Sequence, residues 1–309
     1  MRVITDPQKL NNEIKKVKRG GRTVGFIPTM GALHFGHLSL IKQSSKDNDF
    51  VIVSIFVNPA QFGQQEDLKK YPRPLKNDLQ LCSKAGVNLV FMPNARIMYP
   101  EGFSTFVNVE GLNSVLCGAS RPGHFRGVTT IVAKLLNIIE PDLLYLGQKD
   151  AQQAVIIGRM VKDLNFSVKV KVMPTVREPD GLAVSSRNLY LNKEQRIHAQ
   201  VLFKALSLAK SLIDNGQCDC TRIISRMRLL INKKKQVKID YIAVVDSTNL
   251  KPFKRVSRNC LVALAVYIGK TRLIDNIICH SEESVINSVA DDEESKNEIL
   301  RYIQDDRKR

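Results

Sequence analysis

The chain has 309 residues, more than one hydrophobic core usually holds, and 43% of them are hydrophobic, so we expect two domains that each bury a core. The N-terminal residues MRVITDPQKL contain no apolar signal region, and no apolar run approaches the roughly 20 residues of a membrane span, so we predict a soluble, cytoplasmic protein. The net charge of +17 fits either nucleic acid or an anionic substrate. The lysines lie in mixed segments without interleaved aromatic residues, which favours a phosphate-bearing small molecule over nucleic acid.

From the start of the chain to about residue 172, apolar runs alternate with helical patterns. This alternation predicts an α/β fold, a Rossmann-like parallel sheet with helices on both faces. The predicted strands cover residues 23–28, 50–58, 88–92, 143–146 and 167–172. The predicted helices cover residues 38–46, 75–84, 129–139 and 151–163. Ligands of such sheets bind at the carboxyl ends of the strands, where the motifs TMGALHFGH, NPAQFG and GQKDAQQ lie.

The second half of the chain predicts a smaller α+β domain. After the loop REPDGLAVSSRN, a long helix is expected from its N-cap Asn192, with Gln195 completing a capping box, to Gly216. A further helix over 221–232 and strands over 239–245 and 260–267 follow. We therefore divide the chain into a Rossmann-like domain (1–172), a small lid domain (173–280) and a charged extension (281–309), which we expect to be a solvated helix or disordered.

Residues 26–37, FIPTMGALHFGH, have the pattern of a phosphate-binding loop between a strand and a helix. Gly31 and Gly36 allow close approach of the backbone, and a helix that opens near His37 offers unpaired N–H groups to an anion. His34 and His37 lie one turn apart and could neutralise charge on a phosphate. The H-x-x-H spacing alone also fits a metal half-site or a solvated loop, so partners elsewhere are needed.

Neutral amides follow the strand over 50–58. Asn58 and Gln61 could hold a hydroxylated carboxylic acid without the tight ion pairing that would reduce its nucleophilicity. Because Pro59 follows Asn58, we expect an extended backbone at Asn58. Polar residues that merely end a strand are the alternative. After the strand over 143–146, Lys149 is a compact cation suited to phosphate, and Asp150 could cap the next helix or contact a ribose.

Two loops carry further candidates. Ser185, Ser186 and Arg187 suit a mobile clamp on a polyphosphate, with an ordinary surface turn as the alternative. In the segment RPGHFRG, His124 and Arg126 are either ligand contacts or part of the loop scaffold.

Taken in order, these motifs closely resemble the pantothenate synthetase (pantoate–β-alanine ligase) family of the nucleotidyltransferase superfamily, which also contains class I aminoacyl-tRNA synthetases. The match includes PTMGALHFGH, SIFVNPAQF, YPR, RPGHFRGV, GQKDAQQ, DGLAVSSRN and RLIDN, and it runs from residue 3 to about residue 278. The resemblance implies a two-step ligation with ATP as a substrate. Pantoate first becomes a pantoyl adenylate with release of pyrophosphate, and β-alanine then displaces AMP to give pantothenate.

The resemblance also implies roles for residues. The ATP site would consist of Met30, Gly31, Ala32, Leu33, His34, Phe35, Gly36, His37, Gly147, Gln148, Lys149, Asp150, Val176, Val184, Ser185, Ser186 and Arg187. His37 would act as proton donor, with His34 and Lys149 beside the phosphates. Gln61 and Gln153, to which we add Asn58, would hold pantoate, and Gln61 would also border β-alanine.

Mg²⁺ is expected on the triphosphate, although no cluster of metal ligands identifies its protein partners. The resemblance further implies a homodimer formed through the first domain. Two alternatives stay open. Another carboxylate-adenylating nucleotidyltransferase of the tRNA-dependent kind would need a tRNA-binding domain, for which about thirty residues remain. A basic RNA-binding module would leave Gln61, Lys149 and Gln153 unexplained.

Overall fold

The computed structural model describes residues 1–63, 68–256 and 259–279, so the predicted extension over 281–309 lies outside the described residues. Within them, the larger sheet has the order β1-β4-β3-β2-β5-β6, and every neighbouring pair is parallel. Its strands are β1 (Arg2–Ile4), β2 (Val24–Thr29), β3 (Phe50–Ile55), β4 (Leu89–Phe91), β5 (Leu143–Gly147) and β6 (Lys169–Met173). The predicted α/β class with a Rossmann-like sheet is confirmed.

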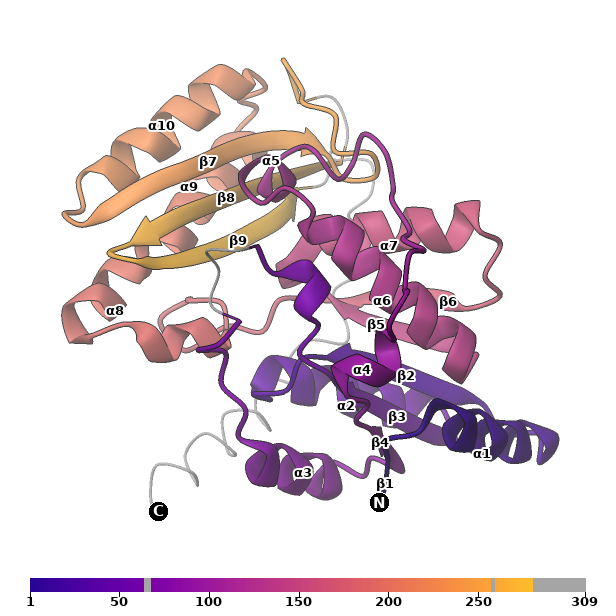
Figure 1. Cartoon of the computed structure of the whole chain (residues 1–309). Coiled ribbons are helices and arrows are strands. Elements are labelled where there is room, and N and C mark those ends of the chain that lie inside the picture. The colour runs from indigo at the N-terminus through magenta and orange to yellow at the C-terminus, as the bar shows by residue number, and fades with distance from the viewer. Residues whose placement is uncertain (64–67, 257–258, 280–309) are drawn as a thin grey trace.

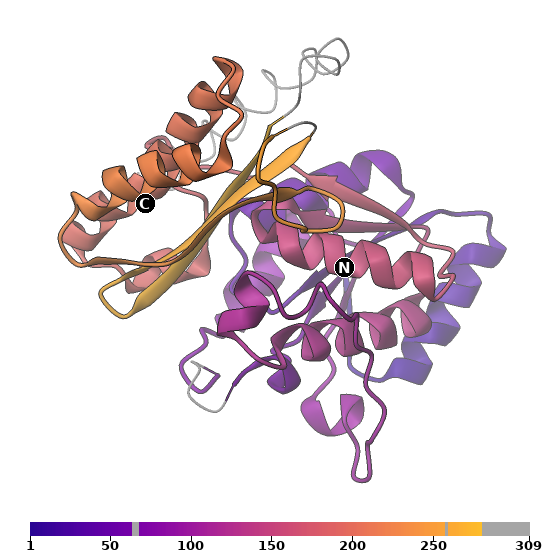
Figure 2. The same ribbon diagram turned by 90° about the horizontal axis from the view of Figure 1, so that it is seen from above.

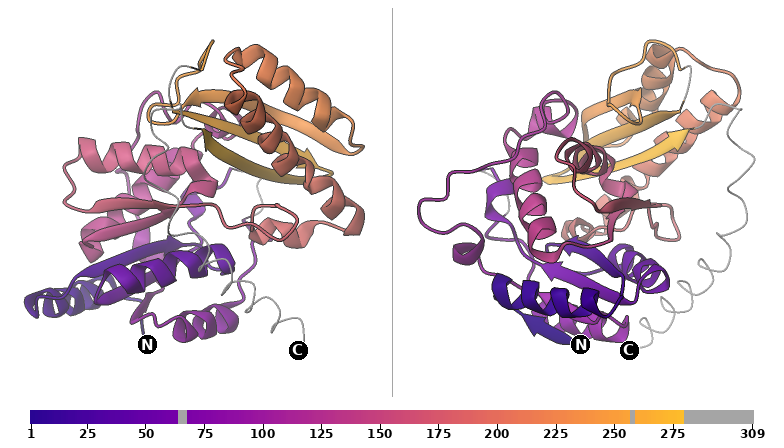
Figure 3. Two further views of the ribbon diagram at one scale, coloured as in Figure 1. Left: turned by 180° about the vertical axis from the view of Figure 1, so that it is seen from behind. Right: turned by 90° about the vertical axis from the view of Figure 1, so that its right-hand side faces the viewer.

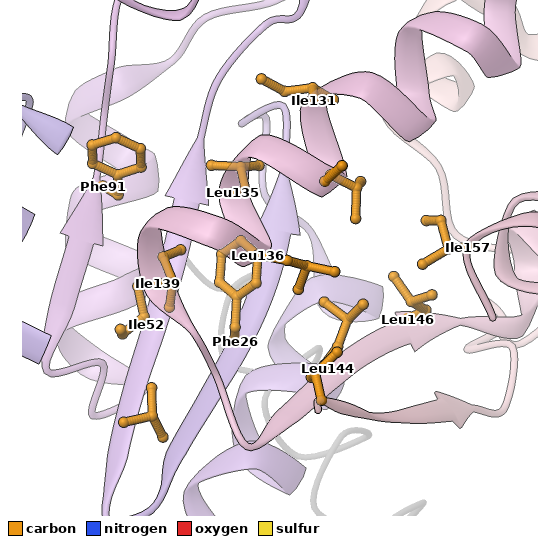
Figure 4. Close-up of a cluster of buried hydrophobic side chains, with 14 of the residues drawn as sticks. Phe26, Ile52, Phe91, Ile131, Leu135, Leu136, Ile139, Leu144, Leu146 and Ile157 are labelled. Carbon is orange, nitrogen blue, oxygen red and sulfur yellow. The ribbon is translucent and has the colours of Figure 1, made fainter. Parts of the chain in front are cut away.

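Helices cover both faces of this sheet because alternate strand residues point in opposite directions. Phe26, Ile52 and Leu144 join the core beneath α1 (Pro7–Arg19), α6 (His124–Ile139) and α7 (Ala151–Asp163), part of which Figure 4 shows. Their neighbours Ile27 and Val53 instead face α2 (Phe35–Asp47) and α3 (Leu75–Lys84). The remaining short elements of this part are η1 (Pro59–Gln61), α4 (Ala95–Met98), α5 (Cys117–Ser120) and η2 (Gln148–Asp150).

The predicted helices over 75–84 and 151–163 match the observed bounds of α3 and α7. By contrast, α6 begins earlier than predicted, at His124, because its first turns contain a glycine that weakens the helical signal. A Cβ atom at Gly127 would lie 2.2 Å from the carbonyl oxygen of Ala60, so only glycine lets η1 pack against this helix. The three-residue, mostly exposed strand β1 was not predicted.

The smaller sheet is antiparallel, in the order β7-β8-β9, and lies beside the larger one (Figures 1 and 2). Its strands are β7 (Val237–Asp246), β8 (Cys260–Ile268) and β9 (Thr271–Cys279). Its apolar face packs against α8 (Lys193–Ala199), α9 (Val201–Asp214) and α10 (Cys220–Asn232), which lie on the side away from the larger sheet (Figure 3). This confirms a small α+β unit, and we propose residues 173–280 as its domain boundaries.

Two details of this unit differ from the predictions. The capping box of Asn192 and Gln195 is present, but the helix predicted from 192 to 216 is interrupted at Gln200, whose backbone N–H bonds to His198 and not to the residue four positions earlier. Strand β9 was not predicted, because Arg272, Asp275 and Asn276 interrupt its apolar pattern. None of the helices in the described part of the chain is both long and apolar enough to cross a lipid bilayer.

Candidate active site

The order of the larger sheet places three polar loops at one edge. From β2 the strand order continues through β3 on one side and through β5 on the other. A parallel sheet opens a crevice at such a switch point, beyond the carboxyl ends of the strands. The loop before α2, the turn η1 after β3 and the turn η2 after β5 all lie there. These three segments carry the predicted motifs.

The loop after β2 is held from inside the protein by Asp78 of α3. Both carboxylate oxygens accept backbone N–H groups, from Ala32 at 2.9 Å and from Leu33 at 2.8 Å, and Asp78 is only 1% exposed. Gly31 and Ala32 have φ angles of +78° and +50°, a conformation that turns successive N–H groups toward one anion. That anion is Asp78, so the N–H groups of residues 32 and 33 are not available to a phosphate, and the predicted anion site is limited to the helix opening near His37.

Sequence reasoning missed Asp78. An aspartate in the first turn of a helix is common, because it interacts favourably with the helix dipole. Its sequence position therefore carried no signal of a bond to a loop more than forty residues away. Burial raises the pKa of this carboxyl group, while the two backbone hydrogen bonds oppose that rise.

The two imidazoles of the predicted site pack against each other. The ring centroids of His34 and His37 are 4.1 Å apart, and the backbone N–H of His34 donates to Nδ1 of His37 at 3.3 Å. In its neutral form His37 therefore carries its proton on Nε2.

Both imidazoles have pKa values below the usual range of histidine, which favours their neutral forms. Burial, followed by the charges of His37 and Lys149, lowers the pKa of His34 to about 2. Burial and Lys149 lower the pKa of His37 to about 4. Neutral rings can donate hydrogen bonds to a phosphate, and they would neutralise its charge only if that charge raised their pKa values. The charge of Lys149 lowers the pKa of both rings, so its ammonium group lies near each of them.

Asn58 has a different role from the one predicted. It is 1% exposed, and its Nδ2 group donates to Gln61 Oε1 and to the carbonyl oxygen of Gly127, both at 3.1 Å. Its Oδ1 atom accepts from the N–H of Ala60 and from the hydroxyl of Tyr99. Its hydrogen-bonding capacity is thus fully used. Asn58 orients Gln61 and does not offer an atom to pantoate, although its predicted extended backbone is confirmed.

Gln61 is connected to two other parts of the crevice. Its Nε2 group donates to Sδ of Met30 at 3.0 Å, which brings it to the loop before α2. The backbone carbonyl oxygen of Gln61 lies 2.8 Å from Nδ1 of His124, and Nε2 of the same ring lies 3.0 Å from Nη1 of Arg121. Because a carbonyl only accepts, Nδ1 of His124 is the protonated nitrogen. His124 thus links η1 to the crevice. Arg126 stacks over Phe106 at 3.9 Å and lines a second cavity together with Gln61 and His124, so it stays a candidate ligand contact.

Lys149, Asp150, Gln153 and Arg187 line one cavity between the two sheets, together with Arg121 and His124. The Nζ atom of Lys149 lies 3.7 Å from Asp150. Asp150 makes no capping bond to α7, so this part of its prediction is wrong, and its carboxylate remains half exposed to the cavity.

The adjacent glutamines 152 and 153 have opposite environments. Gln152 is 7% exposed and bonds to the N–H of Cys117 and to the carbonyl groups of Leu112 and Val115. Both glutamines border the cavity, but these bonds occupy the amide of Gln152, whereas Gln153 is only half-buried. The sequence QQ alone could not distinguish them.

The predicted clamp completes the cavity from the side of the small sheet. Ser185 and Arg187 line a space that adjoins Lys149, and Ser185 Oγ accepts from the N–H of Arg187 at 3.3 Å. The hydroxyl of Tyr71, from the YPR motif, bonds to Ser186. Val184 donates its N–H to the carbonyl of Val176 at 3.0 Å, so these two predicted ATP contacts are neighbours. Within residues 1–63, 68–256 and 259–279, no three His, Cys, Asp or Glu side chains are grouped to hold a metal ion.

Comparison with known proteins identifies the family. The model of the family described as pantoate-beta-alanine ligase matches residues 2–278. The chain is 52% identical over 278 residues to the pantothenate synthetase of Acetivibrio thermocellus, which covers 90% of this chain and 99% of that protein. It is 54% identical over 276 residues to the enzyme of Clostridium novyi, with 87% and 98% covered.

Solved structures agree. The pantothenate synthetase of Thermus thermophilus has a TM-score of 0.85 and 42% identity, covering 90% of this chain and 99% of that one. The pantoate-beta-alanine ligase of Francisella tularensis, complexed with beta-gamma ATP and beta-alanine, has a TM-score of 0.75 and 35% identity, with 90% and 97% covered. With a matched family model over nearly its whole described length and relatives at half identity, the chain belongs to the pantoate–β-alanine ligase family.

Proposed function

We propose that the residues around this crevice bind and align the substrates for two successive steps, in which ATP is consumed and pantoate is joined to β-alanine. In the first step a carboxylate oxygen of pantoate attacks the α-phosphorus, and the bond to the departing pyrophosphate breaks. In the second step the amine of β-alanine attacks the acyl carbon of the pantoyl adenylate, loses a proton and displaces AMP. Because no covalent bond to the protein is required, alignment and charge stabilisation are its main contributions.

The observation that supports this assignment best is that three sequence-distant motifs line two neighbouring cavities that share His124. Lys149, Gln153 and Arg187 line the first cavity, and they come from η2, from α7 and from the segment that leads to the small sheet. Gln61 of η1 lines the second cavity. Neutral amides would hold pantoate, and the cations would face the triphosphate. This distribution places the substrate carboxylate away from a tight ion pair, which keeps it nucleophilic.

We assign the main electrostatic role in the first step to Lys149 and Arg187, because burial lowers the pKa of both imidazoles and favours their neutral forms. His37 would donate the proton on its Nε2 atom as a hydrogen bond to an oxygen that gains negative charge. A bound triphosphate would raise the pKa of both histidines, because a nearby negative charge favours the imidazolium form. His37 could then act as the proton donor that the family resemblance implies.

Ser185, Ser186 and Arg187 would close over the phosphates from the second domain. Closure would keep water away from the adenylate, which water would otherwise hydrolyse. Val176 would contact adenine through its backbone, beside the same segment. Mg²⁺ would arrive bound to the triphosphate and neutralise part of its charge, with phosphate oxygens and water as its main ligands. We also propose a cytoplasmic location and a homodimer formed through the first domain, which light scattering of the purified protein would test.

Pantoate-dependent exchange of labelled pyrophosphate into ATP, in the absence of β-alanine, tests the proposed roles in the first step. We expect exchange to require both ATP and pantoate, and to be lost when Gln153 is replaced by Ala. Exchange that proceeds equally well without pantoate would contradict the proposed substrate site. A Gln153→Ala variant that keeps its normal affinity for pantoate would contradict the role of that residue alone.

A further inference from the structure

The motif RLIDN, residues 272–276, has no role yet in the candidate active site, although the motif faces the cavity of that site. It lies on β9, the edge strand of the small sheet, on the side turned toward the large sheet (Figures 1 and 3). Asp275 and Asn276 are charged and polar, yet they are only 2% and 3% exposed. Buried polar side chains in a strand require partners, and the partners of this pair are the two segments proposed to bind the nucleotide.

Asn276 binds the turn that carries Lys149. Its Nδ2 group donates to the backbone carbonyl oxygens of Gln148 and Lys149, both at 2.9 Å. These carbonyls belong to η2, a single turn of 3₁₀-helix, which has few internal hydrogen bonds to fix its conformation. Both N–H bonds of one amide therefore set the orientation of the backbone from which the ammonium group of Lys149 extends.

Asp275 binds the second nucleotide segment through Arg177. Its two oxygens accept from the guanidinium group at 2.6 and 3.0 Å, and the side chain of Asp275 is fully buried. The same guanidinium donates to the carbonyl oxygen of Gly181 at 3.0 Å. Arg177 follows Val176 directly, and Gly181 lies just before the clamp over 184–187. The ion pair therefore fixes both ends of this loop.

We propose that Asp275 and Asn276, which we call the β9 anchor, are positioning residues for the ATP site. This inference rests on the proposed function of the crevice. It adds two residues that the motifs did not assign to the ATP site. Asn276 acts through the backbone of Lys149, and Asp275 acts through Arg177. One dipeptide of the small domain thereby aligns the cation on one side of the triphosphate with the clamp on the other. Neither residue is a catalytic residue.

The test compares Asn276→Ala and Asn276→Asp with Ser120→Ala. The control removes another contact between the two parts, the bond from Ser120 to Asp240, and leaves the bonds from Arg272 to Asp240 in place. Pyrophosphate exchange gives the KM for ATP, and the reaction of preformed pantoyl adenylate gives the KM for β-alanine. We expect the KM for ATP to rise about tenfold in Asn276→Ala, as for a lost hydrogen bond, with the KM for β-alanine within about twofold of wild type.

Asn276→Asp keeps the size of the side chain but turns acceptors toward two carbonyl oxygens, so we expect a larger rise in the KM for ATP. Ser120→Ala should behave as wild type. The proposal is overturned if both Asn276 variants keep the wild-type KM for ATP, or if the KM values for all substrates rise together with a fall in melting temperature. Absence of exchange in the wild-type protein would instead contradict the proposed function itself.

If the Asn276 variants do not fold, Arg177→Lys tests the other half of the anchor. It keeps the positive charge beside Asp275 but loses the two-pronged geometry of the guanidinium and its bond to Gly181. We expect the same selective rise in the KM for ATP. An unchanged KM for ATP in a folded Arg177→Lys protein would overturn the proposal for Asp275.

Discussion

The two sides of the crevice differ in how their polar groups are used. In the loop after β2, which we call the first wall (residues 30–37), the buried carboxylate of Asp78 accepts two backbone N–H groups, and burial lowers the pKa of both imidazoles. The second wall combines Lys149, which follows β5 of the same sheet, with residues 184–187 of the segment that leads to the small sheet, and its partly exposed cations and hydroxyls line the cavity. The first wall therefore determines geometry and the second supplies charge. The same comparison predicts that substitutions in the first wall cost stability, whereas those in the second cost activity.

The largest effect on activity is expected for Lys149→Ala in the second wall. Removing one preorganised charge from a site where negative charge develops lowers rates by about 10²- to 10³-fold. We expect pyrophosphate exchange to fall by this factor with no change in melting temperature. Lys162→Ala, which removes an exposed lysine of α7, is the matched control. A Lys149→Ala enzyme with a wild-type exchange rate would show that the second wall does not supply the charge.

The largest effect on stability is expected for Asp78→Ala beneath the first wall. It leaves the buried N–H groups of Ala32 and Leu33 without partners, which costs about 1 to 3 kcal/mol for each group. We therefore expect the free energy of unfolding in urea to fall by about 2 to 6 kcal/mol, and the KM for ATP to rise as the loop loses its shape. Asn77→Ala, on the exposed side of the same helix, should change neither value. An unaffected stability would contradict the assignment of Asp78.

The sequence predicted five of the six strands of the large sheet, mainly because the central strands are continuous apolar runs, and missed only the short, exposed β1. It also located the motif loops, since strand ends in a parallel sheet converge on one edge. Long-range polar contacts could not be predicted in this way. Asp78, Asn58 and Gln152 are polar residues whose roles depend on which way they face in three dimensions. Asn58 was assigned to the substrate because its position at a strand end is the same whether its amide faces inward or outward.

Strand β9 illustrates the same limit in the small domain. Its sequence RLIDN was part of the family resemblance, but its alternation is broken by polar residues that are paired with segments about 100 or more positions away. Such pairing leaves no periodic signal in the sequence.

The neutral imidazoles of the first wall predict a dependence of stability on pH. Between pH 4 and 6.5 the unfolded chain binds a proton at His37 that the folded chain does not, because the pKa in the folded state is lowered to about 4. The free energy of unfolding should therefore rise with pH across this window, by up to about 1 kcal/mol per pH unit for this residue. Urea unfolding at about pH 4.5, 5.5 and 6.5 measures the slope. A His37→Gln variant should show a smaller slope, and an equal slope in both proteins would exclude His37 as its source.

The smallest effect is expected for Ser186→Ala in the second wall. Loss of one hydroxyl contact to a phosphate should raise the KM for ATP by about tenfold or less, with an unchanged melting temperature. The hydroxyl of Ser186 also bonds to Tyr71, so the substitution removes two possible contacts at once. Tyr71→Phe removes the shared bond from the other side and leaves the serine hydroxyl in place. If Ser186 binds ATP directly, the Tyr71→Phe variant keeps a KM for ATP near the wild-type value. Equal effects of the two variants would mean that Ser186 acts only by holding Tyr71. In that case the second wall, like the first, fixes the geometry of the site at this point.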